Sequence, residues 1–261
     1  MQDGDLVFLQ NGSMTDASSL GTMTEAPPHL TKEGSSGWSL WESLAKASPD
    51  FGNPTVFNTC IPESYWASFT TTCTNPAFFE AMEAFSGNRP GTGGLVTFKD
   101  SSWRLSIVLY RQPHFIDQPG DVQVFWGYAL QPERIGDYVA KPMAECGGTD
   151  ILREICGHLG FDSKLFEGAT CIPCRMPYIT SMFMPRKITD RPLPVPRSSA
   201  NLAFISQFVE IADDVVFTVE YSIRAAQIAV YQLLGIKREI PAVTRYDQSI
   251  LVLLEAMSKA M

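Results

Sequence analysis

Two kinds of apolar run occur in this chain, and the contrast between them limits the fold that it can adopt. In SSWRLSIVLYRQPHF, large apolar side chains alternate with the others from Trp103 to Leu109, a pattern typical of a strand with one buried face. NLAFISQFVEI, from Asn201 to Ile211, is almost continuously apolar, which is typical of a strand buried on both faces. A long helical pattern follows from Thr218 to Gly235. These patterns predict an α/β fold of the mixed α+β type.

The remaining elements follow from apolar spacing and from turn residues. DLVFLQNGSMTDASSLG, from Asp5 to Gly21, is predicted to be a short buried strand that leads into a loop of small residues, a composition that can hold a phosphate or a cofactor. GTGGL, from Gly91 to Leu95, leads into a strand and is predicted to be a tight turn. Helices are predicted at 38–47, 75–85, 149–160 and 244–261, a further strand at 122–130, and a surface linker at 186–199.

Two of these helices carry specific predictions. The helix at 75–85 is expected to bury Phe78, Met82 and Phe85. The helix at 149–160 is expected to begin at a cap formed by Thr149 or Asp150 and to end at Gly160.

Charge and hydropathy exclude several classes of protein. The chain has 20 Lys and Arg against 28 Asp and Glu, a net charge of -8, which opposes nucleic-acid binding. No apolar run reaches the roughly 18 residues of a membrane span, and the N-terminus lacks the pattern of a secretory signal. A cytoplasmic location is therefore predicted, with the six cysteines kept as thiols.

The C-terminal helix is the one element for which a membrane contact is considered. Its cap is predicted at Thr244, and Ile250, Leu253, Leu254 and Met257 are expected to share one face. Such a face could touch a lipid surface as a peripheral contact, but burial against the protein body is the favoured prediction.

A thiol or zinc site is an alternative function. Cys156, His158, Cys171 and Cys174 are residue types that bind zinc. However, Cys156 and His158 would point in different directions from one helix, and CIPC lacks the strand and helix context of a redox pair. No metal ligand is therefore predicted.

Two polar positions are candidates for ligand binding. His114 in RQPHF directly follows the two-faced strand, with Arg111 and Gln112 as further donors beside it. Thr218 begins a long helix whose free N–H groups attract negative charge. A loop histidine bonded to backbone and an ordinary helix cap are the respective alternatives.

Several long strings, in a fixed order, resemble the C-terminal part of the oleate hydratases, also called the myosin-cross-reactive antigen family. They are NGSMTDASSLG, WSLWESLA, GTGGLVTF, RQPHF, MPYITSMFMPR, LAFISQFVE and FTVEYSIRAAQIAVYQLLG. The resemblance implies an FAD-containing enzyme that adds water to the cis-9 double bond of oleate or linoleate and yields the 10-hydroxy acid. It also implies a carboxylate anchor at one end of an apolar tunnel.

The resemblance assigns roles to individual residues. Ser13, Thr218 and Ser222 match positions that approach the flavin. Val108, Tyr110, Gln112 and His114 fall where the family holds the fatty acid, although Val108 and Tyr110 replace a Thr and an Asn. Because Val108 cannot form a hydrogen bond, the anchor is expected to be altered.

The family's glycine-rich fingerprint, catalytic glutamate and active-site tyrosine belong to an N-terminal portion that these strings do not include. The chain is therefore expected to be inactive alone and to need an N-terminal half, with a homodimer as another option. The implied domains are 1–30 and 198–236 of an FAD-binding Rossmann-like domain, 31–197 for the substrate, and a helical segment at 237–261. A fatty-acid or flavin binding module without catalysis is the main rival.

Overall fold

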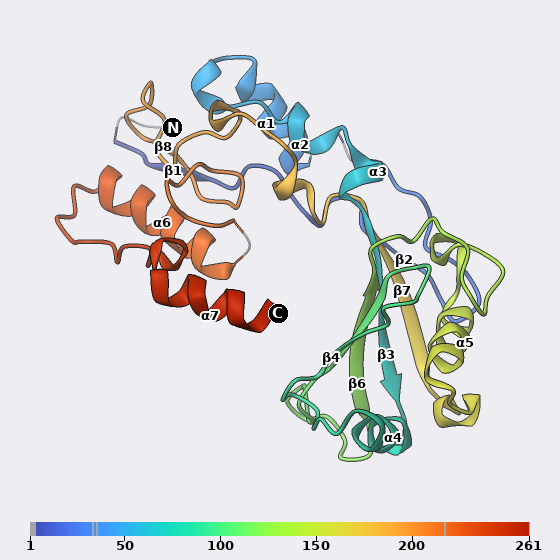
Figure 1. The fold of residues 1–261 in the computed structure, drawn as a ribbon. Helices are drawn as coiled ribbons and strands as arrows, with labels where there is room; N and C mark the ends of the chain where they lie inside the picture. The colour runs from blue at the N-terminus through green and yellow to red at the C-terminus, as the bar shows by residue number, and fades with distance from the viewer. Residues whose placement is uncertain (1–3, 33, 35, 217, 261) are drawn as a thin grey trace. The chain divides into compact units, whose positions relative to one another are not determined.

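The computed structural model describes residues 4–32, 34, 36–216 and 218–260. They form two compact units (Figure 1). A two-stranded unit comprises Met1–Ser13, Gly34–Thr59 and Met182–Met261, and a six-stranded unit comprises Met14–Glu33 and Cys60–Ser181. The predicted mixed α/β class is confirmed, since one sheet is parallel and the other antiparallel. The assignment of a cofactor or a substrate to either unit stays a prediction.

The six-stranded unit is built on one antiparallel sheet with the strand order β2-β7-β3-β6-β5-β4. Its strands are β2 (Ser19–Leu20), β3 (Trp66–Cys73), β4 (Leu95–Thr97), β5 (Leu105–Leu109), β6 (Gln123–Ala129) and β7 (Thr170–Met176). Its helices are α3 (Ile61–Ser64), α4 (Ala77–Ser86) and α5 (Gly148–Leu159). In Figure 1, β3, β6 and β7 lie side by side and α5 lies along β7.

One face of this sheet forms the core together with α4 and α5. The alternation predicted for β5 is confirmed, because the side chains of Trp103, Leu105, Ile107 and Leu109 are at most 2% exposed. They pack in one cluster with residues of α4 and α5. Burial of a side chain of this size stabilises the fold by about 1.5–3 kcal/mol.

The burial predicted for helix α4 is confirmed in part. Phe78 and Met82 are fully buried, as expected. Phe85 is 59% exposed, so its predicted burial is wrong. It stands in the last turn of the helix and contacts the ring of Phe161, which is itself only partly buried.

Helix α5 ends as predicted but does not begin as predicted. Gly160 takes a left-handed conformation at its C-terminus. The N-terminal cap is Gly147, not Thr149 or Asp150. The N–H groups of Gly148 and Thr149 donate to the carbonyls of Thr22 and Met23, both at 2.9 Å. A segment far away in the sequence therefore accepts hydrogen bonds from N–H groups that a side-chain cap would otherwise accept.

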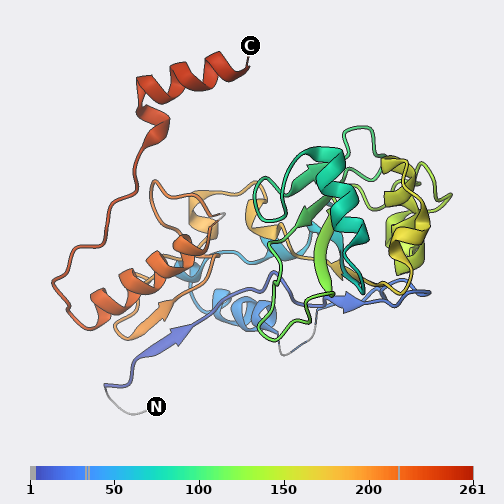
Figure 2. The same ribbon diagram turned by 90° about the horizontal axis from the view of Figure 1, so that it is seen from below.

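The two-stranded unit pairs β1 (Val7–Leu9) with β8 (Leu202–Phe204) in parallel register. Its helices are α1 (Gly37–Ala45), α2 (Thr55–Asn58), α6 (Val219–Leu233) and α7 (Ile250–Ala260). Figure 2 shows β1 next to β8, with α6 alongside. The parallel pair followed by a helix agrees with the predicted pattern.

An aromatic cluster fills part of this unit. The ring of Phe208 lies 4.8 Å from Trp38, 5.5 Å from Phe57 and 5.8 Å from Trp41, measured between ring centroids. Gly12 has a φ of +69° and packs so closely against Phe208 and Trp38 that no β-carbon fits. Glycine at position 12 therefore allows these two rings to pack closely against the backbone.

The apolar segment 201–211 is buried as predicted, but only its first part is a strand. The Ser206 hydroxyl donates to Asn11 Oδ1 at 2.7 Å and accepts the N–H of Phe208 at 2.9 Å. This local hydrogen bond turns the backbone away from the extended conformation. Phe208 then lies in the aromatic cluster. It is buried as predicted, although it is not part of a strand.

The segment 186–199 is not the surface linker that its prolines suggest. Asp190, Arg191 and Val195 are 7%, 4% and 7% exposed. The N–H of Lys187 donates to Asp190 Oδ2 at 2.6 Å, and the Arg191 guanidinium lies over the ring of Phe57. Long-range contacts hold this segment against the unit, so the linker prediction is wrong.

The C-terminal helix differs from its prediction in two ways. A 3-10 turn (Tyr246–Gln248) precedes α7, so Thr244 does not cap it. The apolar face of Ile250, Leu253, Leu254 and Met257 is 49–73% exposed, which corrects the expected burial. No helix within the described residues is long and apolar enough to span a membrane.

Candidate functional site

A glycine turn closes one edge of the six-stranded sheet next to the end of β5. The N–H of Leu109 donates to the Gly94 carbonyl, and the N–H of Gly91 donates to the Leu109 carbonyl, both at 2.9 Å. Gly91 has a φ of +80°, and a β-carbon on Gly94 would collide with the Leu109 carbonyl oxygen. The tight turn predicted for GTGGL is confirmed, and its glycines permit close packing against β5.

A cavity of about 500 Å³ lies at this edge. It is lined by Gly91, Gly94, Leu95, Val108, Leu109, Tyr110, Arg111, Pro113 and His114. Three of the four predicted fatty-acid positions therefore come together: Val108, Tyr110 and His114. The rings of Tyr110 and His114 stack with centroids 4.1 Å apart.

Gln112, the fourth predicted position, does not line this cavity. Its side-chain amide donates to the carbonyls of Tyr110 and Val124, at 3.0 and 2.8 Å. Its oxygen accepts from the Gln118 amide at 2.8 Å, and Gln118 in turn accepts the His114 N–H at 2.9 Å. Gln112 thus holds the loop that carries His114, and its predicted contact with the fatty acid stays a prediction.

The polar groups of the cavity match an anion with an apolar tail. Arg111 supplies a positive charge, and it forms no ion pair with a carboxylate of the described chain. Burial raises the pKa of Tyr110, so its phenol remains a neutral hydrogen-bond donor. Leu95, Val108 and Pro113 supply apolar wall. A carboxylate could accept from the donors while its hydrocarbon chain follows the wall.

The sheet face that carries Val108 is lined with aromatic rings. Val108 pairs with Trp126 across β5 and β6. The Trp126 ring lies 5.0 Å from Tyr128, and Tyr128 stacks on Trp66 at 4.9 Å. All three rings are half-buried. Aromatic rings therefore lie next to the cavity on this face, with Ser68 and Ser106 between them, opposite the packed core.

The predicted flavin positions lie in the two-stranded unit. Ser13 follows β1, Thr218 stands at the N-terminus of α6 with no side-chain cap bond, and Ser222 is one turn further. Hydrogen bonds from the backbone N–H of Glu220 and from the Thr218 hydroxyl lower the pKa of the Glu220 carboxyl. A carboxylate of the chain itself thus already lies at this helix N-terminus.

The four residues of the thiol or zinc alternative do not form a site. Cys171 and Cys174 lie on opposite faces of β7, since they are three residues apart in a strand. Burial raises the pKa of Cys156 to about 11 and that of Cys171 to about 12, so both thiols stay protonated and unreactive. Among the described residues, His158 approaches no cysteine in a potential metal cluster. This alternative is therefore wrong.

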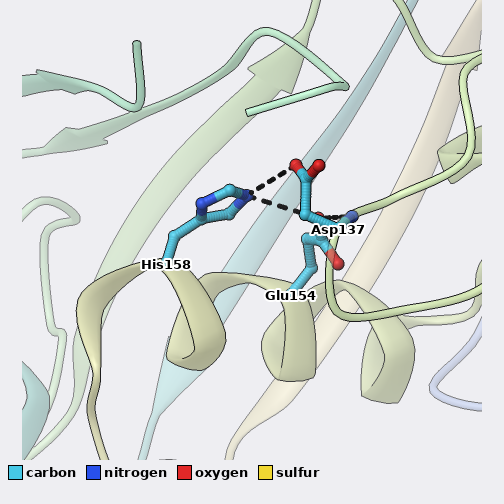
Figure 3. Close-up of side chains that lie close together, drawn as sticks. All are labelled: Asp137, Glu154 and His158. Atoms are coloured by element: carbon cyan, nitrogen blue, oxygen red, sulfur yellow. Dashed lines mark hydrogen bonds and ion pairs between the residues drawn. The ribbon is translucent and has the colours of Figure 1, made fainter. Parts of the chain in front are cut away.

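His158 instead lies close to two carboxylates, those of Asp137 and Glu154 (Figure 3). Sequence reasoning missed this group. Glu154 and His158 have the i, i+4 spacing that places both on one helix face, which is a recognisable signal. Asp137 comes from a loop, and nothing in its local sequence marks it.

Comparison with known proteins decides the family. The family model described as the MCRA family matches residues 1–231. The chain belongs to the MCRA family. The resemblance inferred from the ordered sequence strings is thereby confirmed.

Two curated relatives support this membership. The MCRA chain is 43% identical over 251 residues to an oleate hydratase of Streptococcus pyogenes serotype M49 (strain NZ131), across 91% of this chain and 42% of that protein. It is 31% identical over 277 residues to a linoleate hydratase of Lactiplantibacillus plantarum, across 97% of this chain and 48% of that protein. The chain thus spans less than half the length of the relatives it matches.

Proposed function

We propose that this MCRA chain is part of an FAD-dependent fatty-acid hydratase, which adds water to the cis-9 double bond of oleate or linoleate to give the 10-hydroxy acid. The relatives named as oleate and linoleate hydratases support the reaction class. The observation that carries the proposal is the cavity at the end of β5, which combines Arg111, Tyr110 and His114 with an apolar wall.

In this proposal the cavity receives the carboxylate end of the fatty acid. Arg111 provides the opposite charge, and Tyr110 and His114 donate hydrogen bonds. The hydrocarbon chain then lies along the face that carries Val108 and Trp126. Since the carboxylate position sets which carbon is reached, the anchor determines where water adds.

The flavin is assigned to the two-stranded unit. Ser13, Thr218 and Ser222 would hold it, and their hydroxyls fit polar groups of a cofactor next to the parallel pair β1 and β8. When bound, FAD would organise the site and its charge. The groups that protonate the alkene are assigned to polypeptide outside these 261 residues, such as an N-terminal half.

Arg111→Gln is expected to weaken oleate binding about tenfold, because a charge-assisted hydrogen bond is worth about 1.5–3 kcal/mol. Tyr110→Phe should weaken it by up to about tenfold, since the hydrogen bond that it removes goes to the charged carboxylate. Fluorescence or calorimetric titration with oleate measures both effects. Arg89→Gln is the matched control, because Arg89 is 84% exposed and lies outside the cavity.

Oleyl alcohol serves as a second ligand, since it has the same chain without the carboxylate. The affinity of the chain for oleyl alcohol should be the same with and without the Arg111→Gln substitution. Equal losses for the two ligands, or no loss for either, would contradict the carboxylate anchor. Turnover is measured separately: with FAD but no further polypeptide we expect no 10-hydroxystearate. If oleate binds but an added N-terminal half restores no product, the rival binding module is favoured.

A membrane contact through α7 is proposed as a further property. The exposed apolar face of this helix could rest on a lipid surface, where unsaturated fatty acids reside. Deletion of residues 244–261 should then reduce co-sedimentation with liposomes. Unchanged sedimentation after this deletion would exclude α7 as the contact.

A further inference from the structure

Three potential metal ligands converge at one end of α5. The Nε2 atom of His158 lies 3.3 Å from Asp137 Oδ2 and 3.3 Å from Glu154 Oε1. Figure 3 shows the imidazole of His158 directed at both carboxylates. Glu154 and His158 come from α5, whereas Asp137 comes from the loop after β6. The ligand atoms lie within 4.8 Å of one another.

Neighbouring groups fix both carboxylates in place. Glu154 is fully buried and accepts backbone N–H groups from Asp137, Tyr138 and Val139 at 2.7–2.8 Å. Asp137 accepts the hydroxyl and the N–H of Ser102 at 2.6 and 2.8 Å. Each carboxylate oxygen has two lone pairs, so these bonds leave acceptor capacity for a cation. Hydrogen bonds of this kind commonly orient the ligands of a metal.

The imidazole is fixed as well, and its Nε2 atom is not satisfied. The His158 side chain is only 10% exposed and lies against the rings of Phe98 and Tyr138. Its Nε2 atom is buried and has no hydrogen-bond partner of acceptable geometry. A proton on Nε2 lies in the ring plane and can point at only one acceptor. A cation placed among the three atoms would satisfy all of them.

We propose that Asp137, Glu154 and His158 bind a divalent metal ion, with Zn²⁺ as the best match. Zinc bonds to nitrogen and carboxylate oxygen are about 2.0–2.2 Å, which places tetrahedral ligands about 3.3–3.5 Å apart. The two separations from His158 Nε2, 3.3 Å each, agree with this, whereas the ligand atoms of the two carboxylates are placed only within 4.8 Å of each other. One imidazole with two carboxylates also suits a borderline-soft ion better than Mg²⁺ or Ca²⁺.

The metal would have a structural role, distinct from the proposed fatty-acid cavity. Ser102 precedes β5 and Tyr110 follows it, so the metal site and the cavity lie near opposite ends of that strand. Binding would join α5, the loop at 137–139 and, through Ser102, the turn before β5. The site depends on no flavin or substrate, so its test is independent of the proposed hydratase function.

The test is titration of the metal-free 261-residue chain with Zn²⁺ by calorimetry. We expect one ion per chain. His158→Gln and Asp137→Asn should each weaken binding at least about tenfold, the lower range for loss of even an outer-shell partner of a metal. His29→Gln is the matched control, since His29 is exposed and belongs to no potential metal cluster among the described residues. Asp137→Asn replaces a loop side chain, so it tests the site even if His158→Gln disturbs folding.

Co²⁺ distinguishes this site from one formed by thiols. Binding through nitrogen and oxygen gives no thiolate-to-cobalt charge-transfer band, whereas cysteine ligands give a strong one. Zn²⁺ should also raise the melting temperature of the wild type and of His29→Gln equally, and that of Asp137→Asn clearly less. Absence of Zn²⁺ binding, unchanged affinity in both site variants, or a thiolate band would each overturn the proposal.

Discussion

Replacing Glu154 by alanine is expected to destabilise the six-stranded unit by about 3–5 kcal/mol. The carboxylate is fully buried and accepts three consecutive backbone N–H groups, those of residues 137–139. Its removal leaves these donors unpaired, at a cost of about 1–3 kcal/mol for each one that water cannot reach. Urea unfolding in the presence of a chelator measures the loss without a contribution from bound metal.

Two variants control for this result. Glu154→Gln keeps one acceptor oxygen and should lose clearly less than the alanine variant. Glu145→Ala removes an exposed carboxylate and should change stability by less than about 0.5 kcal/mol. A loss for Glu154→Ala as small as that for Glu145→Ala would show that the three N–H groups do not depend on this side chain.

Phe208→Ala is expected to destabilise the two-stranded unit by about 3–5 kcal/mol, the range for truncating a buried phenylalanine. Its side chain is 2% exposed and contacts the rings of Trp38, Trp41 and Phe57. Alanine leaves a cavity that these large rings cannot fill without moving. Hydrogen exchange read by mass spectrometry should show the loss first in α1 and β8.

The conservative variant tests the cause. Phe208→Leu keeps most of the volume and should cost less than about 1.5 kcal/mol. If the leucine and alanine variants lose the same stability, ring contacts rather than cavity volume dominate. If neither loses stability, the aromatic cluster does not hold this unit together.

Local patterns in the sequence were sufficient for several elements. The alternation from Trp103 to Leu109 predicted the buried face of β5, and the position of Gly160 predicted the end of α5. These features depend on neighbours within a few residues, which the sequence displays directly. The same holds for the turn at Gly91, whose positive φ suits glycine.

Other features depend on segments far apart in the chain. Two N–H groups in the first turn of α5 donate to the carbonyls of residues 22 and 23. The predicted side-chain cap of this helix was therefore wrong. Arg191 is buried over Phe57, although its proline-rich segment reads as a surface linker. In both cases a distant partner supplies the hydrogen bonds or contacts that local composition cannot reveal.

The candidate sites divide in the same way. The sequence by itself determined the family. Through the family it also predicted that Val108, Tyr110 and His114 contact the fatty acid. Only the tertiary structure decided that these three line one cavity while Gln112 holds the loop, because hydrogen bonds to Val124 and Gln118 direct that side chain away. Likewise, only folding brings Asp137 to His158 and Glu154, since the loop from β6 must return to α5 before the three can meet.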